Sequence, residues 1–133
     1  PEDYVKGNEN ILYPKWEKGH YKGGIGEYDR LEQARKINRE AADASASWGM
    51  FQIMGFNYAA CGEESIESFV RSMCESEFKQ LLLTANFIKK NSQMLQALQA
   101  RDWAVFAKCY NGPAYAQNRY DVKLEAAYQK YSL

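Results

Sequence analysis

The sequence is poor in the residues that build metal centres and disulfide frameworks. It has one histidine, His20, and three cysteines, Cys61, Cys74 and Cys109, with no C-x-x-C spacing among them. An odd set of widely spaced cysteines favours neither disulfides nor zinc, so we expect buried free thiols of a protein folded in the cytosol. Any Ser-His-Asp or Cys-His site would have to use His20, which has no nucleophile pattern around it and is interpreted as structural or surface-exposed. No metal site is predicted.

An excess of either charge and long apolar runs are also missing. Lys and Arg together number 17, as do Asp and Glu, so the formal net charge is zero. Nucleic acid is therefore not expected as the partner, because phosphate binding needs a basic patch. No run of about 18 apolar residues is present, which argues against a membrane-spanning helix, and no signal peptide is visible. Since the chain begins at Pro1 instead of Met, we expect a processed, trimmed or partial chain.

The composition that remains is suited to a helical core. Apolar residues make up 46% and aromatic residues 14% of the 133 residues, which suffices for one domain with a single core. Residues 1–26 read as irregular because glycines and Pro14 interrupt any period, and a short β-hairpin is the one regular element that this start admits. Beyond it, apolar residues recur near every 3.6 positions and predict a mainly α fold. Helices are expected from Glu27 to Ala41, Trp48 to Asn57, Ser65 to Ile88, after Asn91, after Asp102, and from about Pro113 to about Tyr131.

The first chemically informative motif is the run Ser47-Trp48-Gly49-Met50-Phe51-Gln52-Ile53. Without a Cβ, Gly49 lets the backbone approach a ligand closely or take up a positive φ. The Gln52 amide can donate and accept hydrogen bonds to sugar hydroxyls or an acetamido group, and inside such an apolar run it needs a partner. Packing at a helix start accounts for the apolar side chains of the run. It leaves Gly49 and Gln52 as candidates for ligand binding.

A second motif, Tyr110-Asn111-Gly112-Pro113 followed by Tyr115, lies near the other end of the chain. An ordinary helix C-terminus explains Gly112, because a glycine often ends a helix there. It does not explain the phenol and the amide that precede it. We interpret the two motifs together as parts of one binding site. The alternative is a plain helical interaction module, in which both motifs serve packing and Gln52 and Tyr110 lie far apart.

A carboxylic acid for sugar chemistry has to lie in a partly apolar pocket that raises its pKa. Most acidic residues here belong to charge-rich helix faces and are interpreted as solvated. Glu27 differs, because it follows a glycine-rich aromatic loop and opens a helix. The helix dipole favours its ionised form, which suits an electrostatic or water-orienting role better than that of a general acid. Glu75 and Glu77 lie within the longest helical pattern, where one of them could face the core or the site.

The two motifs look like the G-L-M-Q … Y-N-A-G signature of goose-type lysozymes and lytic transglycosylases. Over nearly its whole length the chain resembles the N-acetylmuramidase domain of phage endolysins and related bacterial proteins, in the lysozyme-like superfamily. The matching runs are Tyr13-Pro14-Lys15-Trp16, Gly19-His20-Tyr21, Glu27 to Leu31, Ser45 to Asn57, Asp102-Trp103-Ala104, and Tyr110 to Tyr115.

The resemblance implies a single helical, lysozyme-like domain over residues 1–133. It implies a peptidoglycan hydrolase that cleaves the β-1,4 bond between N-acetylmuramic acid and N-acetylglucosamine by glutamate general-acid catalysis, with no metal or organic cofactor. The residues expected along the saccharide cleft are Ser47, Gly49, Gln52, Tyr110, Asn111 and Tyr115. The partner is the glycan strand, and we expect a monomer that acts at the bacterial cell wall, in the periplasm or outside the cell, without membrane insertion, after synthesis in the cytoplasm.

The position of the catalytic acid departs from the family pattern. In the family the catalytic glutamate sits in a Glu-Ser-type motif at the end of a helix that would precede Pro1. Glu75-Ser76 has the same letters but follows the Gly-Gln motif, so the role is not carried over to it. We expect the chain to lack that helix, which leaves Glu27 as the candidate acid within it. A non-catalytic glycan-binding domain and a lytic transglycosylase stay open as alternatives.

Overall fold

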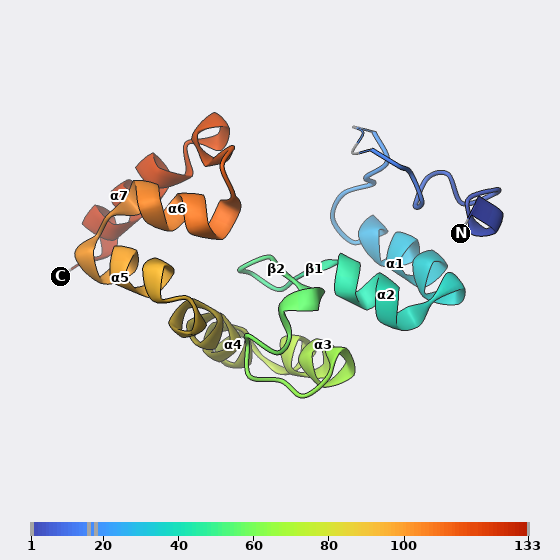
Figure 1. Ribbon diagram of the computed structural model, residues 1–133, viewed down its shortest axis with the longest axis horizontal. Helices are drawn as coiled ribbons and strands as arrows, with labels where there is room; N and C mark the ends of the chain where they lie inside the picture. The colour runs from blue at the N-terminus through green and yellow to red at the C-terminus, as the bar shows by residue number, and fades with distance from the viewer. Residues whose placement is uncertain (1, 16, 18, 133) are drawn as a thin grey trace. The chain divides into compact units, whose positions relative to one another are not determined.

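Helices form most of the computed structural model, which describes residues 2–15, 17 and 19–132 (Figure 1). The chain divides into two compact units: residues up to 59 with 63–80, and residues 60–62 with those from 81 onward. The first unit contains η1 (Glu2–Tyr4), α1 (Gly26–Ile37), α2 (Arg39–Ser45), β1 (Ser47–Trp48), β2 (Ile53–Met54), η2 (Gly55–Asn57) and α3 (Ile66–Glu75). Helix α4 (Glu77–Lys90) begins in the first unit and continues in the second, which also contains α5 (Ser92–Ala100), α6 (Trp103–Asn111), η3 (Tyr115–Asn118) and α7 (Tyr120–Tyr131).

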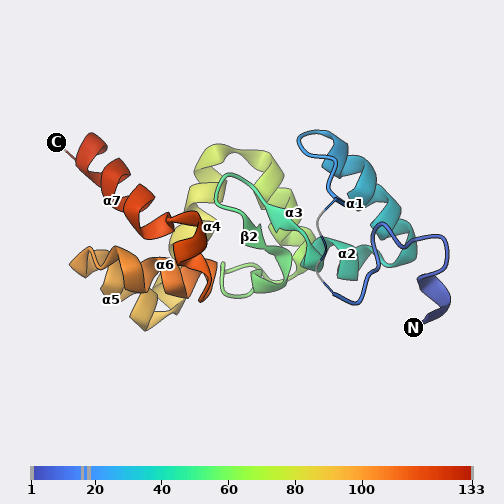
Figure 2. The same cartoon turned by 90° about the horizontal axis from the view of Figure 1, so that it is seen from above.

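Helices α1 and α2 lie side by side in the first unit (Figures 1 and 2). Asn38 separates them, because its extended backbone ends α1 and its side chain accepts a hydrogen bond from Ala41 N at the start of α2. The buried Asp43 of α2 accepts a 2.7 Å hydrogen bond from Arg35 Nε of α1. The carbonyl of Asp43 accepts a second one, at 2.9 Å, from Trp48 Nε1 in β1. Asp43 therefore ties both helices to the strand that follows.

A hairpin occupies the place where the apolar pattern predicts a helix. Ser47 pairs with Met54 and Trp48 with Ile53 in antiparallel register, so the predicted helix from Trp48 to Asn57 is wrong. The helix does not form because of the backbone between the strands. There φ is +70° at Gly49 and +54° at Gln52, whereas an α-helix needs a φ of about −60° at every residue. The mainly α class with one short hairpin is confirmed. The described part of the glycine-rich start, before Gly26, contains no strand.

The second unit is built on α5, α6 and α7, with α6 packed against both of the others (Figures 1 and 2). Its core is formed by Met94, Ala97 and Phe106, against which Tyr110 and Leu124 pack. Helix starts follow the predicted caps. Asn91 Oδ1 accepts from Met94 N at 3.0 Å, and Asp102 Oδ1 accepts from Val105 N at 3.1 Å.

Three predicted helices have other bounds in the structure. The helix predicted from Glu27 to Ala41 is divided at the extended Asn38 into α1 and α2. The long pattern from Ser65 to Ile88 is interrupted at Ser76, whose backbone is extended, so that α3 and α4 are separate helices. The last helix begins at Tyr120 and not near Pro113, because η3 intervenes and Arg119 takes a left-handed conformation before α7.

The cysteines differ in their surroundings. Cys61 is buried, Cys109 is partly buried and Cys74 is exposed, and no disulfide joins any two of them. The expectation of buried thiols is thus correct for Cys61 and wrong for Cys74. In the aromatic run at the start of the chain, Trp16 lies outside the described residues, whereas Tyr13 stacks on His20 with ring centroids 4.4 Å apart.

Candidate functional site

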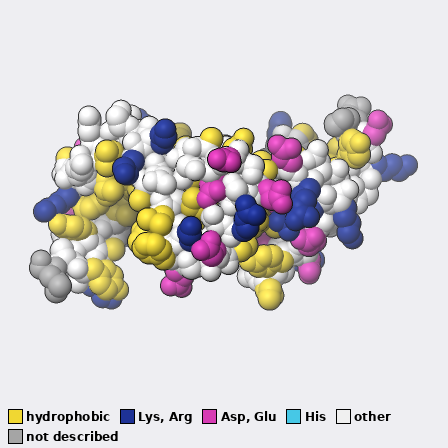
Figure 3. All heavy atoms as spheres, turned by 90° about the horizontal axis from the view of Figure 1, so that it is seen from below, with side chains coloured by type: hydrophobic (Ala, Val, Ile, Leu, Met, Phe, Trp, Pro, Cys, Tyr) yellow, Lys and Arg dark blue, Asp and Glu magenta, His cyan; other side chains and the backbone are white. Residues whose placement is uncertain are grey.

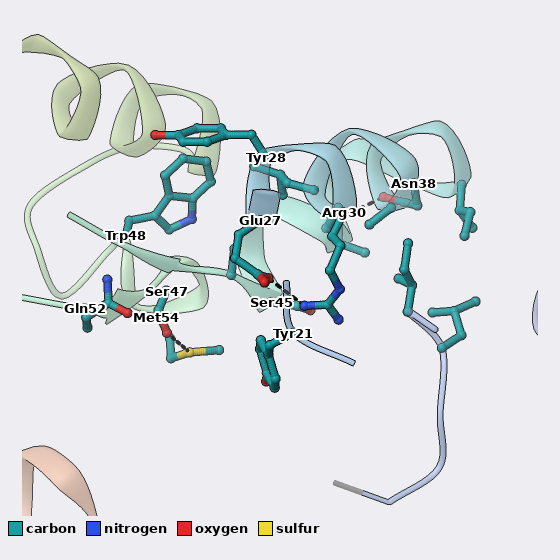
Figure 4. A pocket seen from close by; sticks show the side chains of 18 of the residues that line it. Tyr21, Glu27, Tyr28, Arg30, Asn38, Ser45, Ser47, Trp48, Gln52 and Met54 are labelled. Atoms are coloured by element: carbon teal, nitrogen blue, oxygen red, sulfur yellow. Dashed lines mark hydrogen bonds and ion pairs between the residues drawn. The ribbon is translucent and has the colours of Figure 1, made fainter. Parts of the chain in front are cut away.

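A pocket of about 920 Å³ opens within the first unit, between α1, α2, the hairpin and the segment that precedes α1 (Figure 4). Leu31 and Ile37 of α1 contribute apolar surface, and Tyr21 and Trp48 contribute aromatic rings. A concave site with apolar walls and a few convergent polar groups is typical of small-molecule binding. Four of the residues singled out from the sequence belong to its lining, namely Glu27, Ser47, Gly49 and Gln52.

The turn of the hairpin forms one end of this pocket, where Ser47, Gln52 and Met54 lie together (Figure 4). The carbonyl of Gly49 accepts two hydrogen bonds from Gln52, one from the backbone N–H at 3.3 Å and one from Nε2 at 2.9 Å. The turn thus holds the Gln52 side-chain amide in place through the N–H group of that amide. Among the described residues Gln52 Oε1 has no hydrogen-bond partner, and this exposed oxygen is available to a ligand N–H or O–H.

A glycine is required at position 49 for two reasons. Its φ of +70° is one that side chains with a Cβ rarely adopt, and a Cβ placed there would lie 2.8 Å from Gln80 Oε1 and 3.0 Å from Met73 Sδ. The positive φ predicted as one use of Gly49 is confirmed, and Gln80 and Met73 of the same unit leave no room for a Cβ there. Ser47, on the adjoining strand, is exposed, and its Oγ donates a 3.1 Å hydrogen bond to Met54 Sδ.

Glu27 lies further along the pocket, in the first turn of α1 (Figure 4). Its Oε1 accepts from the backbone N–H groups of Lys22 at 2.6 Å and Gly23 at 2.8 Å, and its Oε2 accepts from Arg30 Nη1 at 2.6 Å. The bond from Gly23, together with Arg30 and Lys22, holds the pKa of Glu27 below 4.5 against the opposing effect of burial. The carboxylate is ionised at neutral pH and cannot donate a proton there. Its bonds fasten the preceding loop to the helix.

Sequence reasoning missed Arg30 and Tyr21, which complete this part of the pocket. The guanidinium of Arg30 lies 4.7 Å from the centre of the Tyr21 ring, and its Nη2 donates to the Asn10 carbonyl at 3.2 Å. Its Nε is buried without a hydrogen-bond partner among the described residues. The spacing of Glu27 and Arg30, three residues apart on one helix, is the signal that could have identified this ion pair.

The residues of the second motif belong to the second unit. Tyr110 and Asn111 are the last two residues of α6, and Tyr115 begins η3. The Tyr110 ring stacks on Phe106 and meets Phe87 edge-on, with centroids 5.7 Å and 5.9 Å away. Burial raises the pKa of Tyr110 to about 12, with a smaller contribution from Cys61, so the phenol stays protonated. Asn111 is exposed and Tyr115 is partly buried.

On the face that Figure 3 shows, Lys and Arg side chains are interspersed with Asp and Glu side chains, so neither sign of charge dominates that face. In the described part of the chain no helix is long and apolar enough to span a bilayer. No group of three or more His, Cys, Asp or Glu residues is placed to hold a metal ion within residues 2–15, 17 and 19–132.

A sequence model of the N-acetylmuramidase family matches residues 1–132. The chain belongs to the N-acetylmuramidase family. A search of curated proteins gives no match. Among solved structures, the muramidase chain is similar to the crystal structure of a Burkholderia AP3 phage endolysin, with 41% sequence identity and a TM-score of 0.87. That alignment covers 98% of this chain and 50% of the endolysin, so the chain spans half the length of the protein that it matches.

Proposed function

We propose that this muramidase chain carries glycan-binding residues of a peptidoglycan hydrolase that cleaves the β-1,4 bond between N-acetylmuramic acid and N-acetylglucosamine. The observation that carries the proposal is the family match over residues 1–132, which includes both motifs. The aromatic and apolar pocket beside the Gly49–Gln52 turn supports it, because an amide oxygen beside ring faces suits an acetamido sugar. No cofactor is part of the proposal, and the partner is the glycan strand of the cell wall.

The proposed roles follow from the surroundings of each residue. Gln52 Oε1 accepts a hydrogen bond from the sugar, Ser47 adds a hydroxyl, and Gly49 forms the floor. Tyr110, Asn111 and Tyr115 provide the second set of saccharide contacts, with the Tyr110 phenol acting as a neutral donor.

The general acid is proposed to lie outside residues 1–133. Hydrolysis of a glycoside needs a carboxylic acid that is protonated at the working pH. Glu27 does not meet this requirement, because three hydrogen-bond donors stabilise its ionised form. We therefore assign the acid to a glutamate N-terminal to Pro1, and assign Glu27 to holding the loop at residues 22–23 against α1. Water attack would give hydrolysis, whereas attack by the muramic acid 6-hydroxyl would give a transglycosylase product.

A non-catalytic glycan-binding domain is the second candidate, and the three hydrogen bonds that keep the Glu27 carboxylate ionised favour it. The test is to incubate purified peptidoglycan with residues 1–133 and with the chain extended toward its natural start, and to identify the products by mass spectrometry. A reducing-end muramic acid from the extended chain alone supports the proposal. A 1,6-anhydro product would identify a transglycosylase. Retained binding with no cleavage by either chain would favour the binding domain, and cleavage by residues 1–133 would refute the placement of the acid.

A further inference from the structure

The side chain of Gln80 in α4 contacts the turn that presents Gln52 from outside the pocket. Gln80 Oε1 accepts a 2.9 Å hydrogen bond from Met50 N, and its Nε2 donates a 2.8 Å hydrogen bond to the Met73 carbonyl. Gln80 is partly buried and does not line the pocket. The side chain of Gln80, 30 residues after Met50 in the sequence, therefore connects the turn to the last turn of α3.

These two partners, the Met50 N–H and the Met73 carbonyl, are backbone groups that have no hydrogen bond within their own elements. The Met73 carbonyl lies in the last turn of α3, and the extended Ser76 prevents the helix from continuing to supply its usual donor. Met50 N–H lies at the second position of the Gly49–Gln52 turn, whose internal bond runs from Gln52 N to the Gly49 carbonyl. Since one partner needs a donor and the other an acceptor, an amide is the side chain that satisfies both at once.

We propose that Gln80 is a positioning residue for the saccharide site. Through its hydrogen bond to Met50 it fixes the position of the turn, and hence the position of the Gln52 amide. This inference rests on the proposed glycan binding by Gln52. The contact is direct, because a Cβ on Gly49 would lie 2.8 Å from Gln80 Oε1. A displacement of the Gln80 amide consequently moves the turn itself. Small misplacements of a binding group are known to lower activity strongly.

The test compares Gln80→Met, which keeps the length of the side chain and removes both hydrogen bonds, with Gln99→Met, the same change at an exposed position of α5. We expect Gln80→Met to weaken binding of a soluble muropeptide by about tenfold and to accelerate amide hydrogen exchange at Met50. Gln99→Met should change neither. If Gln80→Met is stably folded and leaves both the affinity and the Met50 exchange at wild-type values, the inference is wrong.

A carboxylate at position 80 provides a second test that does not depend on the Met variant folding. In Gln80→Glu the ionised side chain can accept from Met50 N but cannot donate to the Met73 carbonyl, whereas the protonated acid can do both. Muropeptide affinity relative to wild type should therefore be low at neutral pH and recover as the pH falls below about 4.5. A defect that is the same at every pH would overturn the inference. If the wild-type protein binds no muropeptide, the proposed function itself fails, and the Met50 exchange would still show whether Gln80 holds the turn.

Discussion

Gln52 is the residue at which backbone strain and ligand binding can be separated most cleanly. It is not a glycine, yet its φ is +54°. A side chain in the left-handed region costs about 1 kcal/mol relative to glycine. The exposed hydrogen bond from its Nε2 to the Gly49 carbonyl contributes roughly 0.5–1 kcal/mol in return. Gln52→Gly removes the backbone strain and also loses this hydrogen bond. Its free energy of unfolding should therefore stay within about 1 kcal/mol of wild type.

Gln52→Ala loses the same hydrogen bond and keeps the strain. It should therefore be less stable than Gln52→Gly by about 1 kcal/mol, which for a chain of this size is a difference of roughly 3–5 °C in Tm. Neither variant carries the amide. If the amide is a sugar ligand, both should bind muropeptide about 3–10-fold more weakly than wild type, and by equal amounts.

The assay is thermal unfolding followed by fluorescence, together with calorimetric titration of a muropeptide. Arg101 provides the matched control, because it also has a left-handed φ, +59°, and lies at the end of α5 in the second unit. Arg101→Gly should be more stable than Arg101→Ala, with no change in affinity. Wild-type affinity in Gln52→Gly would refute the role of the amide. Equal Tm values for Gln52→Gly and Gln52→Ala would refute the strain argument.

Three further predictions follow from the same structure. Tyr110→Phe keeps the ring packed between Phe87 and Phe106; it should lower glycan affinity or turnover more than Tm, and equal losses in both would contradict a ligand role. Asp43→Ala leaves Arg35 without its 2.7 Å partner and should lower the free energy of unfolding by about 2–4 kcal/mol in urea denaturation, with a smaller loss for Asp43→Asn. Because the folded state lowers the pKa of Glu27 from 4.5, its carboxylate adds stability above that pH, at most about 1 kcal/mol given its exposure. The stability gap between wild type and Glu27→Gln should be widest at neutral pH, narrow below about pH 4.5 and close once the pH falls through the folded-state pKa.

The helix starts could be predicted from the sequence because their causes are local. Ser65, Asn91 and Asp102 each accept a hydrogen bond from the backbone three residues on, so residue type and spacing alone identify them.

The hairpin and the break at Ser76 could not be predicted, because they depend on side-chain hydrogen bonds between different elements, which the period of the apolar residues does not reveal. Trp48 Nε1 donates to the carbonyl of Asp43 in α2, and the Gln80 side chain of α4 donates to the Met73 carbonyl in the last turn of α3. Helical periodicity cannot reveal a left-handed φ at Gln52, since that conformation is unusual for the residue type. A favoured ionised form of Glu27 was predicted from the helix dipole, and the structure adds direct hydrogen bonds that lower the pKa of Glu27, chiefly the one from the backbone N–H of Gly23.

The base and the tip of the hairpin differ in how much sequence change they can absorb. At the base, Gly55 sits directly against the Asp43 carbonyl and Ile66, so any side chain there would displace backbone that also receives Trp48. At the tip, Met50 keeps its backbone bond to Gln80 while 58% of its side chain is exposed. Related proteins, and libraries built on this one, should accept many residue types at position 50 while keeping glycine at position 55. The tip of the hairpin can therefore vary in sequence while the fold beneath it stays unchanged.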